Sequence, residues 1–178
     1  MAEKTDAKPA PKKPAAKKKK VPAKKAAPKK AAPKKPTSAD VKPAKANWLT
    51  PYLTVRDADA SLDFYQKAFG FTVGESTQSP EGVTIHAEMM YKRKIVAMFA
   101  PEGAFGGIAA TPAHNHIVSA VNLYVYVDNV DALTERAREA GAYILAEPMD
   151  SPWGDRTALI SDWDGHRWMF ATKIKGEG

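Results

Sequence analysis

Two polar residues on one predicted strand could do acid–base chemistry. His86 and Glu88 lie two residues apart in the alternating run 83–91, so their side chains share one strand face. A histidine that titrates near neutrality beside a carboxylate can act as a proton-transfer pair. The same spacing is also typical of the solvated face of a half-exposed strand. Both interpretations stay open, and His86 and Glu88 are the candidate catalytic residues.

Arg156 is a candidate for binding an anionic group. It ends the run Trp153-Gly154-Asp155-Arg156, just before a predicted strand. A guanidinium there could bind a ligand carboxylate or phosphate through two parallel hydrogen bonds. Alternatively, Arg156 forms a structural ion pair with Asp155 or Asp162.

Two histidines, His114 and His116, have the spacing of a metal-binding pair. This spacing binds metal when a strand holds it, but here it lies in a stretch rich in Gly, Ala and Pro. In such a loop it is more typical of a surface segment.

The stretch SDWDGHRWMF, residues 161–170, combines two aspartates, a histidine, an arginine and three aromatic rings. Its Asp-Gly pair indicates a turn, and a strand follows. Alternation places Arg167 and Met169 on one strand face, while Trp168 and Phe170 lie on the other. We expect Trp168 and Phe170 to be core residues.

Hydrophobic spacing predicts two copies of a β-α-β-β-β unit. In each copy, a strand leads into a helix. The first helix is capped by Asp57 and ended by Gly70, and the second is capped by Asn129 and ended by Gly141. The eight predicted strands are 48–57, 71–77, 83–91, 94–100, 121–127, 142–147, 156–161 and 166–173. We therefore expect one domain over 47–178, with modules 48–100 and 120–173 joined by a loop, 101–119.

The first 46 residues differ in composition from this domain. They hold 16 Lys, three acidic residues and eight prolines, a net charge of +13, whereas residues 47–178 have a net charge of −6. So few apolar side chains cannot offset the entropy of ordering, and frequent proline prevents a continuous helix. We predict that residues 1–46 form a disordered basic arm.

Several classes of protein are disfavoured by what the sequence lacks. Without cysteine, the chain has no disulfides, no thiolate nucleophile and no Cys-type zinc site. It shows no apolar signal-peptide run and no stretch of 18 apolar residues that could span a membrane. The expected location is the cytoplasm.

Together, the doubled unit and the motifs VRDADASLDFYQKAFGF, HAEMMY, YVDNVDALTERAREAGA, WGDR and DWDGHRWMF resemble the vicinal oxygen chelate superfamily. This superfamily includes glyoxalase I, bleomycin-resistance proteins and extradiol dioxygenases, and the resemblance is strongest to its PhnB-like branch. It implies an α+β fold, in which two βαβββ modules form a curved, cup-like mixed sheet with helices on the outer face. Dimers are common in this superfamily, so the resemblance also implies a homodimer.

The resemblance indicates where a metal would bind in the superfamily's enzymes. The four corresponding positions here are Thr50, Ala97, Asn122 and Met169. Because none is a good donor for a divalent ion, we predict no metal and no cofactor.

Strand alternation predicts which side chains line the cup. They either form a ligand pocket with aromatic walls or simply fill the barrel. The lining residues are Thr50, Tyr52, Thr54, Ile95, Ala97, Phe99, Asn122, Tyr124, Tyr126, Arg167 and Met169. Those expected to bind ligand are Tyr52, Thr54, Phe99, Asn122, Tyr124, Tyr126, Arg167 and Met169. The resemblance to the superfamily adds Trp153 and Arg156, which it implies lie at the mouth of the cup.

The arm resembles linker-histone tails and the tails of bacterial nucleoid proteins. Its ammonium groups favour sequence-independent binding to nucleic acid, and no aromatic residue is interleaved for base stacking. Alternatively, the arm improves solubility or contacts ribosomes or anionic membranes. The lysines expected to contact nucleic acid are Lys17, Lys18, Lys19, Lys20, Lys24, Lys25, Lys29, Lys30, Lys34 and Lys35.

The sequence therefore predicts a metal-free, ligand-binding protein of the glyoxalase and bleomycin-resistance type. Its arm would tether it to nucleic acid, which suggests association with the nucleoid. The alternative is a metal-dependent lyase, isomerase or dioxygenase of the same superfamily with a non-standard site.

Overall fold

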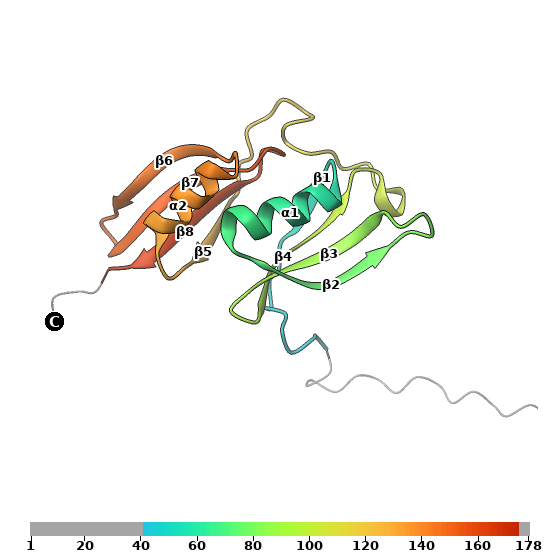
Figure 1. The fold of residues 1–178 in the computed structure, drawn as a ribbon, viewed down its shortest axis with the longest axis horizontal. Coiled ribbons are helices and arrows are strands. Elements are labelled where there is room, and N and C mark those ends of the chain that lie inside the picture. The colour runs from blue at the N-terminus through green and yellow to red at the C-terminus, as the bar shows by residue number, and fades with distance from the viewer. Residues whose placement is uncertain (1–40, 175–178) are drawn as a thin grey trace, which may run out of the picture. The chain divides into compact units, whose positions relative to one another are not determined.

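The computed structural model of the chain describes residues 41–174, which form an α+β fold with two four-stranded mixed sheets (Figure 1). The predicted disorder of residues 1–46 therefore concerns mostly residues outside the described part, as do the ten lysines expected to contact nucleic acid. Among residues 41–174, neither α-helix has the length and hydrophobicity of a membrane-spanning helix.

The first module contains one helix and one sheet. Its elements are β1 (Tyr52–Val55), α1 (Ala58–Phe69), β2 (Thr72–Gln78), β3 (Thr84–Tyr91) and β4 (Lys94–Pro101). The strand order is β1-β4-β3-β2, in which β1 pairs parallel with β4 and the other pairs are antiparallel.

The second module repeats this arrangement. After a short 3₁₀ turn, η1 (Ala104–Gly106), come β5 (Asn122–Tyr126), α2 (Val130–Glu139), β6 (Tyr143–Asp150), β7 (Asp155–Ser161) and β8 (Arg167–Lys173). The order β5-β8-β7-β6 matches that of the first sheet, and β5 pairs parallel with β8. The predicted pair of βαβββ modules is confirmed.

The predicted capping residues begin and end the two helices. Asp57 accepts a hydrogen bond from the Ala60 backbone N–H, and Gly70 ends α1 with a left-handed φ of 68°. Asn129 caps α2 in the same way, and Gly141 follows that helix with a φ of 87°. Both glycines adopt a left-handed backbone conformation that is unfavourable for residues with a Cβ atom.

One hydrophobic core includes residues of both modules. Tyr65 and Phe69 of α1 pack against Trp168 and Phe170 of β8, with ring centroids 5.5 Å apart for Tyr65–Trp168 and 4.7 Å for Phe69–Phe170. Trp168 and Phe170 are fully buried, as predicted. We call the sheet face that packs on the helices the covered face, and the opposite face the open face.

The SDWDGH turn holds the second module against the first. Tyr65 of α1 donates a hydrogen bond to Asp162 (2.8 Å), and Arg56 at the end of β1 donates through Nε to Asp164 (2.6 Å). A hydrogen bond also joins His166 Nε2 to a β1 carbonyl oxygen (2.7 Å). Both carboxylates are buried, so the two aspartates of this motif bind groups of the protein itself.

The first strand is shorter than predicted. It begins at Tyr52, because Pro51 has no backbone N–H to donate to a strand ladder. Trp48 and Leu49, expected inside the strand, instead lie before it with exposed side chains.

A β-bulge in β4 changes which of its side chains face the open side. Met89 pairs with Ala97, but the next residue, Met90, pairs with Ile95, so Val96 is an extra residue in β4. Such an insertion reverses the alternation of the side chains on the two sides of the bulge.

The predicted cup-facing set in β4 is therefore wrong for two residues. Ala97 and Phe99 are fully buried on the covered face, where Phe99 contacts the ring of Tyr65. Ile95 shares the open face with Met90 but is covered by Ala46. Strict alternation gave the wrong face because a bulge leaves no clear signal in the sequence.

Candidate ligand-binding site

Two tyrosines on β5 share one buried carboxylate. Tyr124 and Tyr126 each donate a hydrogen bond to Asp155 Oδ2, at 2.8 Å. Their hydroxyls reach across β8 to Asp155 on β7, and the β8 residue that pairs with Tyr126 is Ala171, which has a short side chain. Asp155 is 2 % exposed, whereas the rings of Tyr124 and Tyr126 are half exposed. The carboxylate thus fixes two solvent-facing rings on the open face of the second sheet.

A third aromatic side chain joins this pair. Trp153 donates a hydrogen bond through Nε1 to the Tyr124 hydroxyl (3.3 Å), and its side chain is exposed. The rings of Tyr124 and Tyr126 meet edge to face, with centroids 5.4 Å apart. We call Tyr124, Tyr126 and Trp153 the aromatic cluster.

Asp155 sets the electrostatics of the cluster. Burial acts to raise the pKa of Asp155, but the hydrogen bonds from Tyr124 and Tyr126, with attraction from Lys173, outweigh it and lower the pKa. The hydrogen bond to this carboxylate raises the pKa of Tyr126 to about 12. Among the described residues, Asp155 Oδ1 has no hydrogen-bond partner. The cluster therefore surrounds a carboxylate that stays charged at neutral pH.

We predict that Asp155→Asn lowers the pKa of Tyr126 from about 12 toward the ordinary tyrosine value near 10. Because the folded-state pKa is raised, the stabilisation from this hydrogen bond is complete below pH 10 and is lost as pH rises toward 12. NMR titration of ¹³Cζ-labelled tyrosine measures the shift, and Tyr126→Phe assigns the signal. An unchanged Tyr126 pKa in Asp155→Asn would contradict the assignment of Asp155 as its cause.

Other predicted binding residues lie on the same open face. Asn122 is exposed, and Arg167 and Met169 are half-buried. Asn122 pairs with Arg167, and Tyr124 with Met169, across the β5–β8 ladder. The structure thus brings these residues together on the second sheet, as predicted.

His86 and Glu88 share the open face of the first sheet but interact with different partners. A hydrogen bond joins His86 Nδ1 to the Tyr52 hydroxyl (2.9 Å), and the two rings stack with centroids 5.6 Å apart. Glu88 instead accepts a hydrogen bond from the Glu75 backbone N–H (3.2 Å). Within the described part of the chain, no hydrogen bond joins the two residues. Their arrangement does not supply a ready proton-transfer pair.

Thr54 lies one position along the same open face from Tyr52. It is half-buried, and its carbonyl oxygen is the β1 group that bonds to His166. Tyr52 itself is 54 % exposed. These two residues are therefore available on the first sheet, apart from the aromatic cluster of the second.

Arg156 lies on the covered side and is engaged by carboxylates of the protein. It donates hydrogen bonds to both carboxylate oxygens of Asp131 on α2 and to Asp150 on β6 (2.9 Å). Arg156 therefore forms structural ion pairs, as the alternative interpretation expected, but its partners are not the expected Asp155 or Asp162. These hydrogen bonds raise the pKa of the guanidinium further, Asp131 contributing most. Arg156 is not positioned to bind a ligand at the aromatic cluster.

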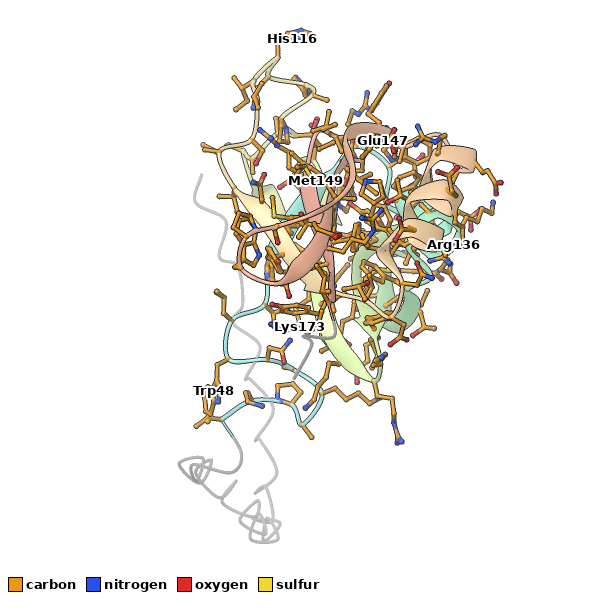
Figure 2. The ribbon with its side chains drawn as sticks, turned by 90° about the vertical axis from the view of Figure 1, so that its left-hand side faces the viewer. Trp48, His116, Arg136, Glu147, Met149 and Lys173 are labelled. Carbon is orange, nitrogen blue, oxygen red and sulfur yellow. The ribbon has the colours of Figure 1, made fainter. Side chains whose placement is uncertain are left out.

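The two histidines of the 101–119 loop do not converge. His114 Nδ1 is 2.8 Å from Glu102 Oε2, whereas His116 is exposed at the tip of the loop (Figure 2). The surface-segment interpretation fits this geometry better than a metal pair.

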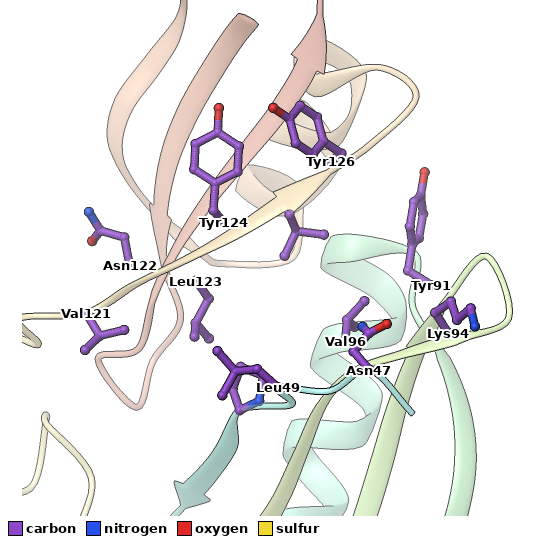
Figure 3. A pocket seen from close by; sticks show the side chains of 12 residues that line it. Asn47, Leu49, Tyr91, Lys94, Val96, Val121, Asn122, Leu123, Tyr124 and Tyr126 are labelled. Carbon is purple, nitrogen blue, oxygen red and sulfur yellow. The ribbon is translucent and has the colours of Figure 1, made fainter. Parts of the chain in front are cut away.

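A groove of about 650 Å³ runs along the free edge of β5 (Figure 3). Sequence reasoning did not single out most of its lining, because Leu123 and Val125 alternate toward the covered face. Only the proximity of two strands distant in sequence reveals it. The lining residues are Asn47, Leu49, Pro51, Tyr91, Lys94, Val96, Val121, Asn122, Leu123, Tyr124, Val125 and Tyr126.

The paired βαβββ sheets and their motifs match a known family. The sequence profile of the Glyoxalase/Bleomycin resistance protein/Dioxygenase superfamily matches residues 45–170. The chain belongs to this superfamily.

Relatives of this superfamily member include proteins from mycobacteria. An uncharacterized protein of Mycobacterium bovis is 33 % identical over 138 residues, which cover 76 % of this chain and 87 % of that protein. Among solved structures, TioX from Micromonospora sp. ML1 is 27 % identical, with a TM-score of 0.56 over 71 % of this chain and 98 % of TioX. A superfamily enzyme from Burkholderia phytofirmans PsJN shares the fold at 23 % identity and a TM-score of 0.55, covering 73 % and 98 % of the two chains.

The positions that correspond to metal ligands in the superfamily's enzymes do not fit a divalent ion here. Thr50 and Asn122 offer only neutral oxygens, Met169 offers a thioether, and Ala97 is buried in the core. In residues 41–174, no group of three or more His, Asp or Glu side chains is placed to hold a metal. We therefore derive no chemistry through a metal at these positions.

Proposed function

We propose that this superfamily member binds a small, planar or partly aromatic organic ligand on its open face and does not transform it. One observation carries the proposal, namely the exposed aromatic cluster that buried Asp155 holds in place. Rings fixed by hydrogen bonds lose little conformational entropy when a flat ligand stacks on them. The charged carboxylate beneath the rings favours a ligand with a positive charge, because opposite charges attract without direct contact.

The arrangement of polar groups supports binding over catalysis. A histidine and a carboxylate that act together in proton transfer must lie within hydrogen-bond reach of each other. Glu88 is buried and accepts a backbone hydrogen bond, and His86 is engaged by Tyr52. A metal-dependent lyase, isomerase or dioxygenase is the alternative, and the donor set at the superfamily's ligand positions disfavours it.

We propose further that the basic arm tethers the protein to nucleic acid without sequence preference. The support is its charge of +13, which contrasts with the net −6 of residues 47–178. A chain of ammonium groups releases condensed counterions from a polyanion, which gives affinity that depends strongly on salt. The tether would keep the ligand-binding domain close to DNA.

Ligand binding is tested by native mass spectrometry of the intact protein with a library of planar aromatic compounds, including metal-free bleomycin. We expect at least one compound to bind at one equivalent. Replacing Tyr124 or Trp153 by alanine should weaken its binding by about tenfold, the order expected when one aromatic contact is lost.

Tyr143→Ala is the matched control, because Tyr143 is also exposed but lies on β6, outside the cluster. Its affinity should stay within twofold of the unchanged protein. Equal losses in all three variants, or no bound compound at all, would contradict the proposed site. One tightly held equivalent of a divalent metal per chain, detected by elemental analysis, would favour the enzyme alternative.

A further inference from the structure

Three consecutive cations lie at the hairpin between β3 and β4, with Lys92 and Arg93 in the turn and Lys94 at the start of β4. Lys92, Arg93 and Lys94 are three of the 11 Lys and Arg residues in the acidic region 47–178. Lys92 forms an ion pair with Asp128, whereas no ion pair of Arg93 or Lys94 with another described residue is found. The turn therefore presents positive charge at one end of a domain that is otherwise acidic.

The turn has backbone geometry that its residues do not favour. Lys92 and Arg93 have positive φ values of 45° and 66°, a conformation for which Asn-Gly is the preferred pair in two-residue hairpins. Local stability alone would thus favour other residues here. Two charged side chains at such a turn are consistent with selection for their charge.

The segment that joins the arm to the domain is fixed beside this turn. The Ile95 backbone N–H donates to the Lys45 carbonyl oxygen (3.0 Å), and the Asn47 side chain donates to the Ile95 carbonyl oxygen (3.0 Å). Lys94 Nζ donates to the Ala44 carbonyl oxygen (3.3 Å), and Ala46 is buried against Ile95. Charges distant in sequence, at 42–45 and 92–94, are thereby brought side by side.

An exposed aromatic ring lies next to these charges. The side chain of Trp48 is 83 % exposed, and Lys42 Nζ lies 5.2 Å from the ring centroid. Figure 2 shows Trp48 and His116 at opposite ends of the described chain, with Trp48 pointing away from the domain. No aromatic residue is interleaved among the arm's lysines, but the structure places Trp48, which follows the arm, beside the arm's Lys42.

We infer that Trp48, Lys42, Lys45, Arg93 and Lys94 form a docking site for single-stranded nucleic acid, with Trp48 stacking on a base. This inference rests on the proposed tethering of the arm to nucleic acid and deepens it. Cations that contact the backbone beside an aromatic ring that stacks on bases are the usual elements of single-strand binding sites. A base in a duplex is already stacked, so Trp48 adds nothing to duplex binding.

Charge and area favour nucleic acid over an anionic membrane. Membrane association scales with the apolar area that inserts, and among residues 41–50 the exposed large apolar side chains are those of Val41, Trp48 and Leu49. A single ring is enough, in contrast, to stack on one base.

The test uses the full-length protein, (dT)30 and a 30-base-pair duplex, with fluorescence anisotropy at fixed salt. We expect Trp48→Ala to weaken (dT)30 binding by about tenfold, the order for loss of one base stack, and duplex binding by less than twofold. Intrinsic fluorescence should be quenched by (dT)30, and this quenching should be lost in Trp48→Phe but retained in Trp153→Phe, in which another exposed Trp is replaced.

A second variant removes charge without endangering the fold. K92N/R93G places the preferred Asn-Gly pair in the turn, so its melting temperature should not fall. It should weaken (dT)30 binding by about tenfold. The slope of the logarithm of the binding constant against the logarithm of the salt concentration should become shallower by about one unit or more. The control K67A/R136A also removes two positive charges, but outside this site. Its affinity for (dT)30 should stay within about twofold of that of the unchanged protein.

The outcomes separate this inference from the proposed tethering. If the unchanged protein binds neither nucleic acid, both are wrong. If the unchanged protein binds both nucleic acids, but Trp48→Ala and K92N/R93G bind (dT)30 with the same affinity, the docking site is wrong and the tethering stands. If Trp48 fluorescence responds to phosphatidylserine vesicles and not to (dT)30, the partner is a membrane and the inference is overturned.

Discussion

A chain that begins at Lys45 is expected to bind duplex DNA about 1,000-fold more weakly than the full-length protein at 50 mM salt, since several phosphate contacts are lost. The deletion removes 15 of the 16 arm lysines and leaves a chain with a net charge of −5. Such a chain is repelled by a polyanion, apart from local contacts at the 92–94 turn. Anisotropy measured between 50 and 200 mM salt should also show that most of the salt dependence disappears.

A full-length chain in which residues 1–44 are shuffled is the control for this deletion. Counterion release depends on the number of charges and not on their order, so the shuffled chain should retain most of the affinity. Equal DNA retention by the full-length chain and the chain that begins at Lys45, at low salt, would remove the proposed tethering function.

Asp162→Ala is expected to lower the free energy of unfolding by about 3–5 kcal/mol, because it leaves several buried donors without an acceptor. Asp162 accepts hydrogen bonds from the Tyr65 hydroxyl (2.8 Å) and Trp168 Nε1 (2.9 Å), and from the backbone N–H groups of Asp164 (3.1 Å) and His166 (2.9 Å). Tyr65 and Trp168 belong to different modules, so the loss should destabilise their junction. Urea unfolding measures the difference.

Asp63→Ala provides a matched control for Asp162→Ala. Asp63 lies on α1 with an exposed side chain and carries the same charge, so its replacement should change the free energy of unfolding by at most about 0.5 kcal/mol. A loss below about 1 kcal/mol in Asp162→Ala would mean that the SDWDGH turn is not a structural junction.

The strand face of the candidate binding residues could be predicted from the sequence where alternation is regular. On β5 and β8 the ladder runs without a register shift, so Tyr124, Tyr126 and Met169 lie on the predicted face. On β4 the bulge at Val96 reverses the alternation, and Phe99 and Ala97 lie in the core instead. A single inserted residue is enough to exchange the two faces of a strand.

Partners of charged residues could not be predicted in the same way. Arg156 was expected to meet Asp155, its neighbour in sequence, or Asp162. Neighbours on a strand point to opposite faces, so Asp155 lies on the open side with Tyr126, while Arg156 reaches Asp131 on α2. Only the packing of α2 on β7 determines that choice.

The sequence by itself determined the two repeated modules, their helix caps at Asp57 and Asn129, and the contrast between a basic arm and an acidic domain. These features depend on local periodicity, capping and composition, which neighbouring residues encode. Only the tertiary structure decided that Asp155 lies beneath two tyrosines, that Asp162 links two modules and that residues 44–47 lie beside the start of β4. Each of these depends on strands distant in sequence and on their register, which local patterns do not specify.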